Sequence, residues 1–182
     1  MNGVLNLESD IVLEDHIKNI SLGKKDSLEN LYNSTRNSVF GFAFSILNNV
    51  TDAEDVMQDT YINILKYANM YDPRNKPLAW IFTITKNLCY TKIENKKKNV
   101  ASSIDEIENL ISNHSDSHYD KALIKAILEV LTDEERQIVI LSSISGFKNR
   151  EIAKLLNLNL STVLSKYHRA VKKIRAIYRE EM

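Results

Sequence analysis

The polar side of one predicted helix is the part of the sequence best equipped for binding chemistry. In residues 157–174, NLNLSTVLSKYHRAVKKI, apolar residues recur at three- and four-residue steps, which predicts an amphipathic helix. Its opposite side presents hydroxyl groups and cations: Thr162, Ser165, Lys166, Arg169, Lys172 and Lys173. Such groups donate hydrogen bonds to phosphates and to base edges in DNA. We therefore expect this side to lie against a nucleic acid, unless it simply remains in water.

A short helix and a turn precede the amphipathic helix. The residues NREIAKLL, 149–156, have a helical period of their own, and Asn157 follows in a turn of roughly three or four residues. Asn tolerates the left-handed backbone conformation that such a turn needs. This order predicts a helix-turn-helix, whose second helix enters the major groove of duplex DNA. An ordinary helical hairpin is the alternative.

A second candidate surface combines aromatic rings with cations. The helix predicted to open at Pro77 carries Trp80, Asn87 and Tyr90 on one side, with lysines such as Lys86 at its edges. Unpaired bases stack on aromatic rings while lysines meet phosphates, so this combination suits a single strand better than a duplex. The alternative is that Trp80 and Tyr90 are core residues.

A third candidate surface lies on the helix expected to begin near residue 52. One side of this helix holds acidic, amide and apolar residues together with one lysine: Asp55, Gln58, Asp59, Ile62, Leu65 and Lys66. Apolar side chains among acids and amides indicate a protein-binding face. A helix buried on all sides would show a similar pattern.

The elements that must position these surfaces are predicted to be helices. The 182 residues are 43% hydrophobic and include only four Gly and two Pro, which favours helices with few tight turns. Helices are expected near 10–22, 25–48, 52–71 and 77–97, with capping boxes at Thr51/Glu54 and Thr132/Glu135. Pro77 suits a first helical turn, and Gly146 is expected to end the helix that follows Thr132.

Charge alternates along the chain although the net charge is zero. Residues 1–65 hold 4 Lys/Arg and 10 Asp/Glu, 66–98 hold 8 and 2, 99–120 hold 0 and 5, and 121–182 hold 12 and 7. Two basic blocks are typical of separate polyanion-facing surfaces. The Ser-, Asn- and Asp-rich stretch 99–120 predicts a flexible linker. We therefore expect an all-α chain of two small helical domains, 1–98 and 121–182, with the helix-turn-helix in the second.

Other kinds of site are not indicated by the sequence. It has no Gly-rich phosphate loop and no nucleophile beside a base, so no catalytic residue, cofactor or small-molecule substrate is expected. His114 and His118 lack a third metal ligand, and the lone Cys89 is expected to be a small buried apolar residue. Without a membrane-length apolar run or a signal segment, no membrane insertion and a cytoplasmic location are expected.

These residues together resemble the sigma subunits of bacterial RNA polymerase, specifically the small two-domain extracytoplasmic-function (ECF) group. Residues 52–98, from DAEDVMQD to IENKKK, look like that family's core-binding and promoter-melting domain. Residues 131–178, from LTDEERQ to KKIRAIY, look like its domain for reading the minus-thirty-five element. The similarity runs from roughly residue 25 to the C-terminus.

The resemblance implies a non-enzymatic factor that binds core polymerase, recognises a two-part promoter and supports DNA melting. Docking on the coiled coil of the polymerase's largest subunit is implied for Asp55, Gln58, Asp59 and Ile62. Contact with the melted minus-ten strand, including a base flipped into the loop 69–76, is implied for Tyr71, Asp72, Arg74, Lys76, Trp80, Lys86, Asn87 and Tyr90. Reading of the minus-thirty-five element is implied for Ser161, Thr162, Leu164, Ser165, Lys166, Arg169 and Lys173. The family also implies an anti-sigma partner.

Two other functions remain open from the sequence. A stand-alone helix-turn-helix regulator would bind duplex DNA as a dimer, but it leaves the aromatic surface and the acidic face unexplained. A helical protein-interaction module would use its charged faces only for solubility, and it predicts weak, unspecific DNA binding.

Overall fold

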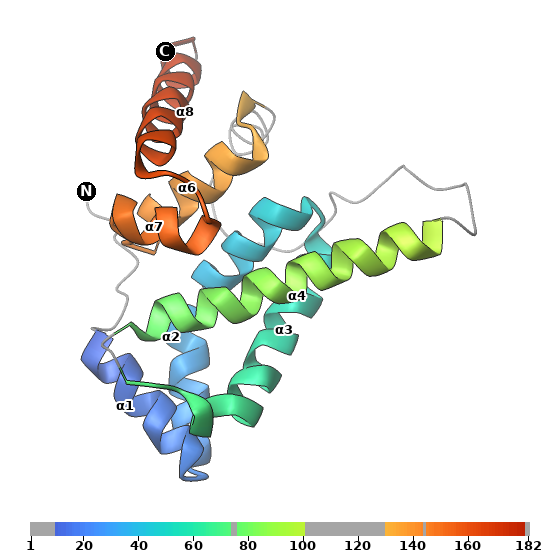
Figure 1. Ribbon diagram of the computed structural model, residues 1–182, viewed down its shortest axis with the longest axis vertical. Helices are drawn as coiled ribbons and strands as arrows, with labels where there is room; N and C mark the ends of the chain where they lie inside the picture. Colours follow the sequence, from blue (N-terminus) through green and yellow to red (C-terminus); the bar gives the residue numbers. More distant parts are fainter. Residues whose placement is uncertain (1–9, 74–75, 101–129, 144, 181–182) are drawn as a thin grey trace. The chain divides into compact units, whose positions relative to one another are not determined.

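The computed structural model describes residues 10–73, 76–100, 130–143 and 145–180, and every regular element among them is a helix (Figure 1). The chain divides into two compact units, Met1–Glu108 and Asn109–Met182. The division falls inside the predicted linker 99–120, most of which lies outside the described residues. The predicted all-α class is confirmed, whereas the boundaries 1–98, 99–120 and 121–182 stay predictions.

The first unit is a helical bundle. Its elements are α1 (Asp10–Ser21), α2 (Lys25–Leu47), α3 (Val50–Tyr67), the short 3₁₀ helix η1 (Ala68–Met70) and α4 (Pro77–Val100). The fully buried core includes Leu13, Ile17, Leu31, Val39, Phe42, Val56, Ile64, Ile81 and Phe82. Phe42 and Phe82 meet edge to face with ring centroids 5.1 Å apart, which joins α2 to α4. Ile81 and Phe82, adjacent residues of α4, therefore lie on its core side.

Buried hydroxyl groups in this bundle bond to one another. The hydroxyls of Thr35 and Tyr61 lie 2.8 Å apart, and the Thr60 hydroxyl donates to the Thr85 hydroxyl at 3.3 Å. Burial raises the pKa of Tyr61 above its usual range, so this phenol stays neutral. Paired hydroxyls avoid the free-energy cost of a lone buried polar group, so they connect α2, α3 and α4 without weakening the core.

The ends of α3 differ from the prediction. The helix begins at Val50 and is capped by Asn49, whose side chain accepts the Asp52 N–H at 2.9 Å, so the predicted Thr51/Glu54 capping box is wrong. Asn is a strong N-cap residue, and Asn49 precedes Thr51 by two positions, so the helix begins earlier than predicted. At the other end α3 stops at Tyr67 and η1 follows, which shortens the predicted loop 69–76 because Asn69 and Met70 belong to η1. Tyr67, the last residue of α3, is 46% exposed.

One end of α4 matches the prediction and the other extends beyond it. The helix begins at Pro77, as predicted, and continues to Val100. Asn99 and Val100, the first two residues of the predicted linker, are therefore helical.

The second unit contains α6 (Asp133–Ser143), α7 (Asn149–Leu156) and α8 (Leu160–Glu180). Its core holds Ile138, Leu141, Ile152, Val163 and Ala170. The predicted capping box before α6 is confirmed. The Thr132 N–H donates to the Glu135 carboxylate at 3.0 Å, and the Glu135 N–H donates to the Thr132 hydroxyl at 3.3 Å.

Two residues with a left-handed backbone conformation form the turns of this unit. Gly146, with φ of +69°, lies between α6 and α7, and the following Phe147 N–H bonds back to the Leu141 carbonyl at 2.9 Å. Asn157, with φ of +56°, ends α7, and its N–H bonds to the Lys154 carbonyl at 3.3 Å. The predicted tolerance of Asn at this turn is confirmed, so α7 and α8 form the helix-turn-helix.

Within the described ranges, none of the helices combines the length and the apolarity that crossing a membrane requires.

Candidate nucleic-acid and protein interfaces

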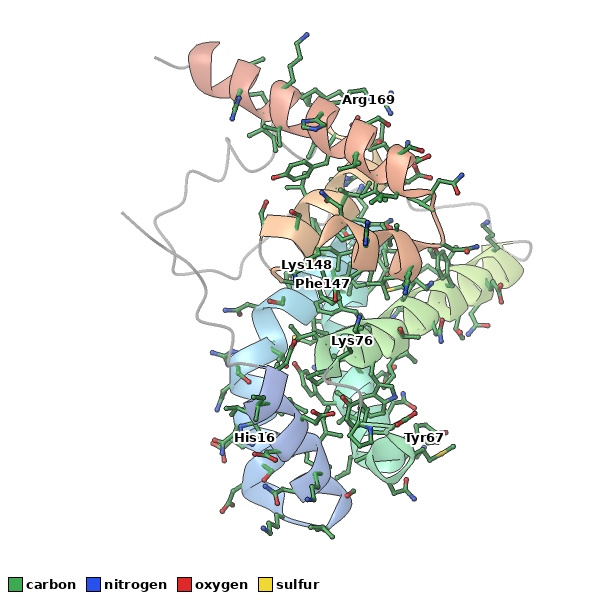
Figure 2. The ribbon with its side chains drawn as sticks, turned by 60° about the vertical axis from the view of Figure 1, so that its left-hand side comes forward. His16, Tyr67, Lys76, Phe147, Lys148 and Arg169 are labelled. Carbon is green, nitrogen blue, oxygen red and sulfur yellow. The ribbon has the colours of Figure 1, made fainter. Side chains whose placement is uncertain are left out.

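The polar side of α8 is open to solvent. Val163 and Ala170 lie on the core side of α8 and are fully buried. The residues exposed on its other side are Ser161, Leu164, Ser165, Arg169 and Lys172. Figure 2 shows Arg169 on this helix. Leu164 is 37% exposed, so an apolar group lies among hydrogen-bond donors, as a thymine methyl would require. The face has the chemistry of a duplex-reading surface.

Two lysines of this predicted face are engaged within the unit. The Lys166 ammonium lies 2.6 Å from the Glu134 carboxylate, and both side chains stay partly in water. The Lys173 ammonium donates to the Glu135 carboxylate at 2.7 Å and to the Val130 carbonyl at 3.1 Å. Glu135 is only 3% exposed, so Lys173 neutralises a buried charge and its ammonium points into the unit.

The carboxyl of Glu135 has a lowered pKa. Burial acts to raise it, but the hydrogen bond from Lys173 and those from Thr132 outweigh burial and bring it below its usual value. Sequence reasoning placed Lys173 with the DNA-binding residues because helical spacing shows that a cation is near the polar side. Spacing does not show which acid from another helix lies within reach.

The outward side of α4 carries the aromatic and cationic residues that the sequence predicts. Asp72, Lys76 and Asn87 are exposed, Tyr90 is 49% exposed, and Tyr71, Trp80 and Lys86 are half-buried. Figure 2 labels Lys76, immediately before α4. Arg74 lies outside the described residues. The alternative that Trp80 and Tyr90 are core residues is wrong for Tyr90, while Trp80 lies at the edge between core and surface.

The core side of α4 confirms the prediction for Cys89. This residue is fully buried, and burial raises the pKa of its thiol to about 12. A neutral buried thiol behaves as a small apolar group and not as a nucleophile.

The half-buried rings of Tyr71 and Trp80 pack on each other beside the start of α4. Their centroids are 5.1 Å apart at an interplanar angle of 55°. The Tyr71 hydroxyl donates to the Glu14 carboxylate of α1 at 3.1 Å. Burial, together with the hydrogen bond and charge of Glu14, raises the pKa of Tyr71 to about 12, so the phenol remains a donor. Sequence reasoning missed Glu14, since nothing in the spacing of α1 connects it to a residue 57 positions away.

The exposed side of α3 has the mixed character that the sequence predicts. Gln58 and Asp59 are exposed, and the apolar Ile62 and Leu65 are 54% and 57% exposed. The alternative of a helix buried on all sides is therefore wrong. Exposed apolar side chains beside acids are suited to contact with another protein.

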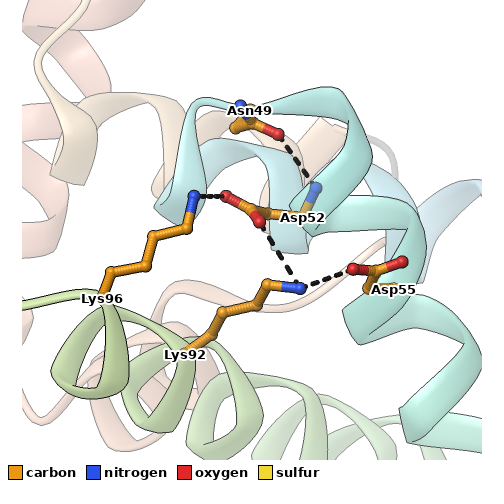
Figure 3. A network of polar contacts seen from close by, with 5 residues as sticks. All are labelled: Asn49, Asp52, Asp55, Lys92 and Lys96. Atoms are coloured by element: carbon orange, nitrogen blue, oxygen red, sulfur yellow. Dashed lines mark hydrogen bonds and ion pairs between the residues drawn. The ribbon is translucent and has the colours of Figure 1, made fainter. Parts of the chain in front are cut away.

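Two lysines of α4 reach the acids of the first turns of α3, as Figure 3 shows. The Lys92 ammonium lies 2.7 Å from Asp55 and 3.4 Å from Asp52, and Lys96 pairs with the buried Asp52. Although burial lowers the pKa of Lys92, the carboxylates of Asp55 and Asp52 raise it above its usual value. Asp55, which the resemblance assigns to docking, is thus also part of a contact between α3 and α4, and its side chain remains 53% exposed.

Two family models match the chain in the order that the resemblance implies. Sigma-70 region 2 matches residues 31–99, and sigma-70 region 4 matches residues 121–174. The first range contains the exposed side of α3 and nearly all of α4. The second contains α6, α7 and most of α8.

Known proteins extend this similarity over most of the chain. The ECF RNA polymerase sigma factor SigK of Mycobacterium ulcerans is 23% identical, covering 87% of this chain and 89% of that protein. The ECF RNA polymerase sigma factor EcfG of Rhodopseudomonas palustris is 25% identical, covering 77% and 78%.

Solved structures share the fold. The sigma factor RpoE from Bartonella quintana, in complex with the anti-sigma factor NepR, matches with a TM-score of 0.70 and 21% identity, covering 83% of this chain and 96% of that chain. CnrH, in complex with the cytosolic domain of CnrY, matches with a TM-score of 0.62 and 20% identity, covering 94% and 99%. With both sigma-70 regions present in sequence order, the chain belongs to the extracytoplasmic-function group of RNA polymerase sigma factors.

Proposed function

We propose that this sigma factor binds core RNA polymerase with α3, the melted minus-ten strand with the α4 side of the first unit, and the minus-thirty-five duplex with α8. The observation that carries the proposal is the different chemistry of three outward sides: acidic and apolar on α3, aromatic and cationic on α4, hydroxylic and cationic on α8. Each chemistry suits a different one of these three partners.

The docking residues on α3 are Asp55, Gln58, Asp59 and Ile62. Burying Ile62 and Leu65 on the coiled coil of the polymerase's largest subunit removes two half-exposed apolar side chains from water. The acids beside them steer the encounter with a basic partner and fix its orientation. Asp55 would dock while it keeps its contact with Lys92.

The melted strand would follow the outward side of α4 and the residues before it. Trp80 and Tyr90 offer rings for stacking, and Lys76 and Lys86 supply positive charge for phosphates. Tyr71, Asp72 and Asn87 complete the surface, and Arg74 joins it on sequence grounds alone. A flipped base costs a few kcal/mol of unstacking, which stacking on such rings offsets.

The duplex-reading side of α8 consists of Ser161, Thr162, Leu164, Ser165 and Arg169, with Lys172 beside them for phosphate contact. Lys166 would exchange its surface pair with Glu134 for a phosphate, because an exposed ion pair contributes little free energy. We leave Lys173 out of the interface, because moving its ammonium would strand the buried Glu135 charge.

An anti-sigma factor is the further partner that we propose. RpoE, which shares the fold, was solved with the anti-sigma factor NepR, and CnrH was solved with the cytosolic domain of CnrY. We also propose that this protein acts in the cytoplasm and has no enzymatic activity of its own, because the polymerase would supply the catalysis.

Transcription with purified components tests the proposal. Core polymerase is given a randomised promoter library with and without this protein, and the transcripts are sequenced. Starts from an enriched two-part promoter only in the presence of the protein would support it. Folded protein that gives no specific starts but binds duplex DNA alone would instead favour the stand-alone regulator.

A further inference from the structure

Tyr71 has hydrogen-bond partners from two parts of the first unit. Its hydroxyl donates to the Glu14 carboxylate of α1 at 3.1 Å. The Lys76 backbone is a hydrogen-bond partner of the same hydroxyl. Tyr71 and Lys76 stand on either side of residues 74 and 75, so one oxygen joins both flanks of this segment to α1.

The ring of Tyr71 continues this connection to α4. It packs on Trp80 at 5.1 Å between centroids, and both rings are half-buried. Neither ring is enclosed by the core alone, so the hydroxyl contact with Glu14 adds to the contacts that hold the Tyr71 ring against Trp80. The Tyr71 hydroxyl is thus already engaged within the first unit.

We propose that Glu14 is a positioning residue for the melted-strand surface, fixing Tyr71 and thereby the orientation of Trp80. The inference rests on the proposed role of α4 in promoter melting, and it adds α1, which precedes the region 2 match at residue 31, to the machinery that reads the minus-ten element. In this role Glu14 acts through Tyr71 and not by contact with DNA.

The physical reason is preorganisation. A base that leaves the duplex loses stacking, and a ring already held in place recovers that loss without first being ordered itself. Without Glu14, Tyr71 and Trp80 would have to be ordered when the strand binds, and this entropy cost would reduce the free energy of binding. Single-strand affinity and promoter opening would therefore fall, whereas duplex reading by α8 would not.

Two substitutions of Glu14 separate its hydrogen bond from its charge. Glu14→Ala removes the acceptor, whereas Glu14→Gln keeps a carbonyl oxygen for the Tyr71 hydroxyl. Tyr71→Phe removes the donor and keeps the ring. Asp15→Asn is the matched control, because Asp15 is an exposed acid one position along the same helix.

Trp80 supplies a direct readout in the full-length protein because it is the only tryptophan in the sequence. Its fluorescence is followed during titration with a single-stranded oligonucleotide of the minus-ten sequence obtained from the promoter library. Glu14→Ala and Tyr71→Phe are expected to shift the Trp80 emission and weaken binding about five- to tenfold, the effect of losing one hydrogen bond that positions a site. Glu14→Gln and Asp15→Asn are expected to stay within about twofold of the unchanged protein.

Holoenzyme measurements complete the test, with promoter opening and minus-thirty-five binding assayed for each variant. Opening reduced in Glu14→Ala and restored in Glu14→Gln, with upstream binding unchanged, is the expected result. Equal behaviour of Glu14→Ala and Asp15→Asn would overturn the role of Glu14 while leaving the sigma-factor function intact. Failure of the unchanged holoenzyme to open any promoter would instead overturn the proposed function.

Discussion

The two proposed DNA surfaces, on α4 and on α8, are built in different ways. At the α4 surface, the rings of Trp80 and of Tyr71, which precedes this helix, are half-buried, and Tyr71 has contacts with α1 and with the Lys76 backbone. On α8 the side chains that face outward are mostly exposed, and the ion pair of Lys173 with the buried Glu135 connects this helix to the start of α6. A flipped base needs a surface ordered in advance, whereas a duplex presents its groove already formed, so a well-placed helix is enough.

This comparison predicts that losing a ring on α4 has the largest functional effect. Trp80→Ala should reduce promoter opening by about 10- to 100-fold, because base–aromatic stacking contributes about 1–3 kcal/mol per base. Closed-complex binding through the minus-thirty-five element should remain. Opening is measured by permanganate reactivity of unpaired thymines, and Trp80→Phe is the control that keeps a ring. If Trp80→Ala weakens both steps equally, the two surfaces are not separable in the way proposed.

The ion pair between Lys173 and the buried Glu135 should matter for stability. Lys173→Ala should lower the free energy of unfolding of the second unit by about 1–3 kcal/mol, because it leaves the Glu135 charge buried without its cation. Lys172→Ala, one position along and exposed, should change it by less than about 0.5 kcal/mol. Chemical denaturation measures both variants, and equal losses would contradict the structural assignment of Lys173.

The same pair predicts a pH dependence. Because folding lowers the pKa of Glu135 below its ordinary value of 4.5, its carboxylate adds stability above that pH. This contribution should be lost as the pH falls through the folded-state value. Denaturation curves of the unchanged protein and Lys173→Ala should therefore converge in acid, and parallel curves throughout would rule out this linkage.

On the exposed side of α8, Arg169→Ala should weaken minus-thirty-five binding by about 1–2 kcal/mol, as expected for one contact with a base or phosphate. Binding is compared on the selected element and on single-base variants of it. A loss confined to one base position assigns Arg169 to base reading, and a uniform loss with a shallower salt dependence assigns it to phosphate. An unchanged affinity would remove Arg169 from the interface.

The smallest expected effect concerns the lysines that connect α4 to α3. Lys92→Met should reduce the free energy of unfolding by about 1 kcal/mol or less, because Asp55 is half-exposed and Asp52 keeps Lys96. Promoter opening should not change. Lys97→Met, at an exposed lysine of the same helix, is the stability control. A loss of opening comparable to that of Trp80→Ala would place Lys92 in the DNA surface.

Local residue chemistry was enough to predict most of the helices. Pro77 begins α4, Thr132 and Glu135 cap α6, and Asn157 adopts the left-handed conformation, as expected. The apolar stripes of α4 and α8 face their cores because periodicity is a property of the segment itself. The start of α3 was misjudged because Asn49 and Thr51 are both good caps, and the chain uses the earlier one.

The sequence by itself determined the fold class, the helix-turn-helix and the family, since each depends on residue types within one segment. The tertiary structure alone decided which charged and polar groups are committed within the protein. Lys173 neutralises Glu135, Lys92 contacts Asp55, and Glu14 holds Tyr71, although these partners lie 38, 37 and 57 positions apart. An ion pair or hydrogen bond forms within a few ångströms in space, and helical spacing carries no information about which residue another helix brings that close.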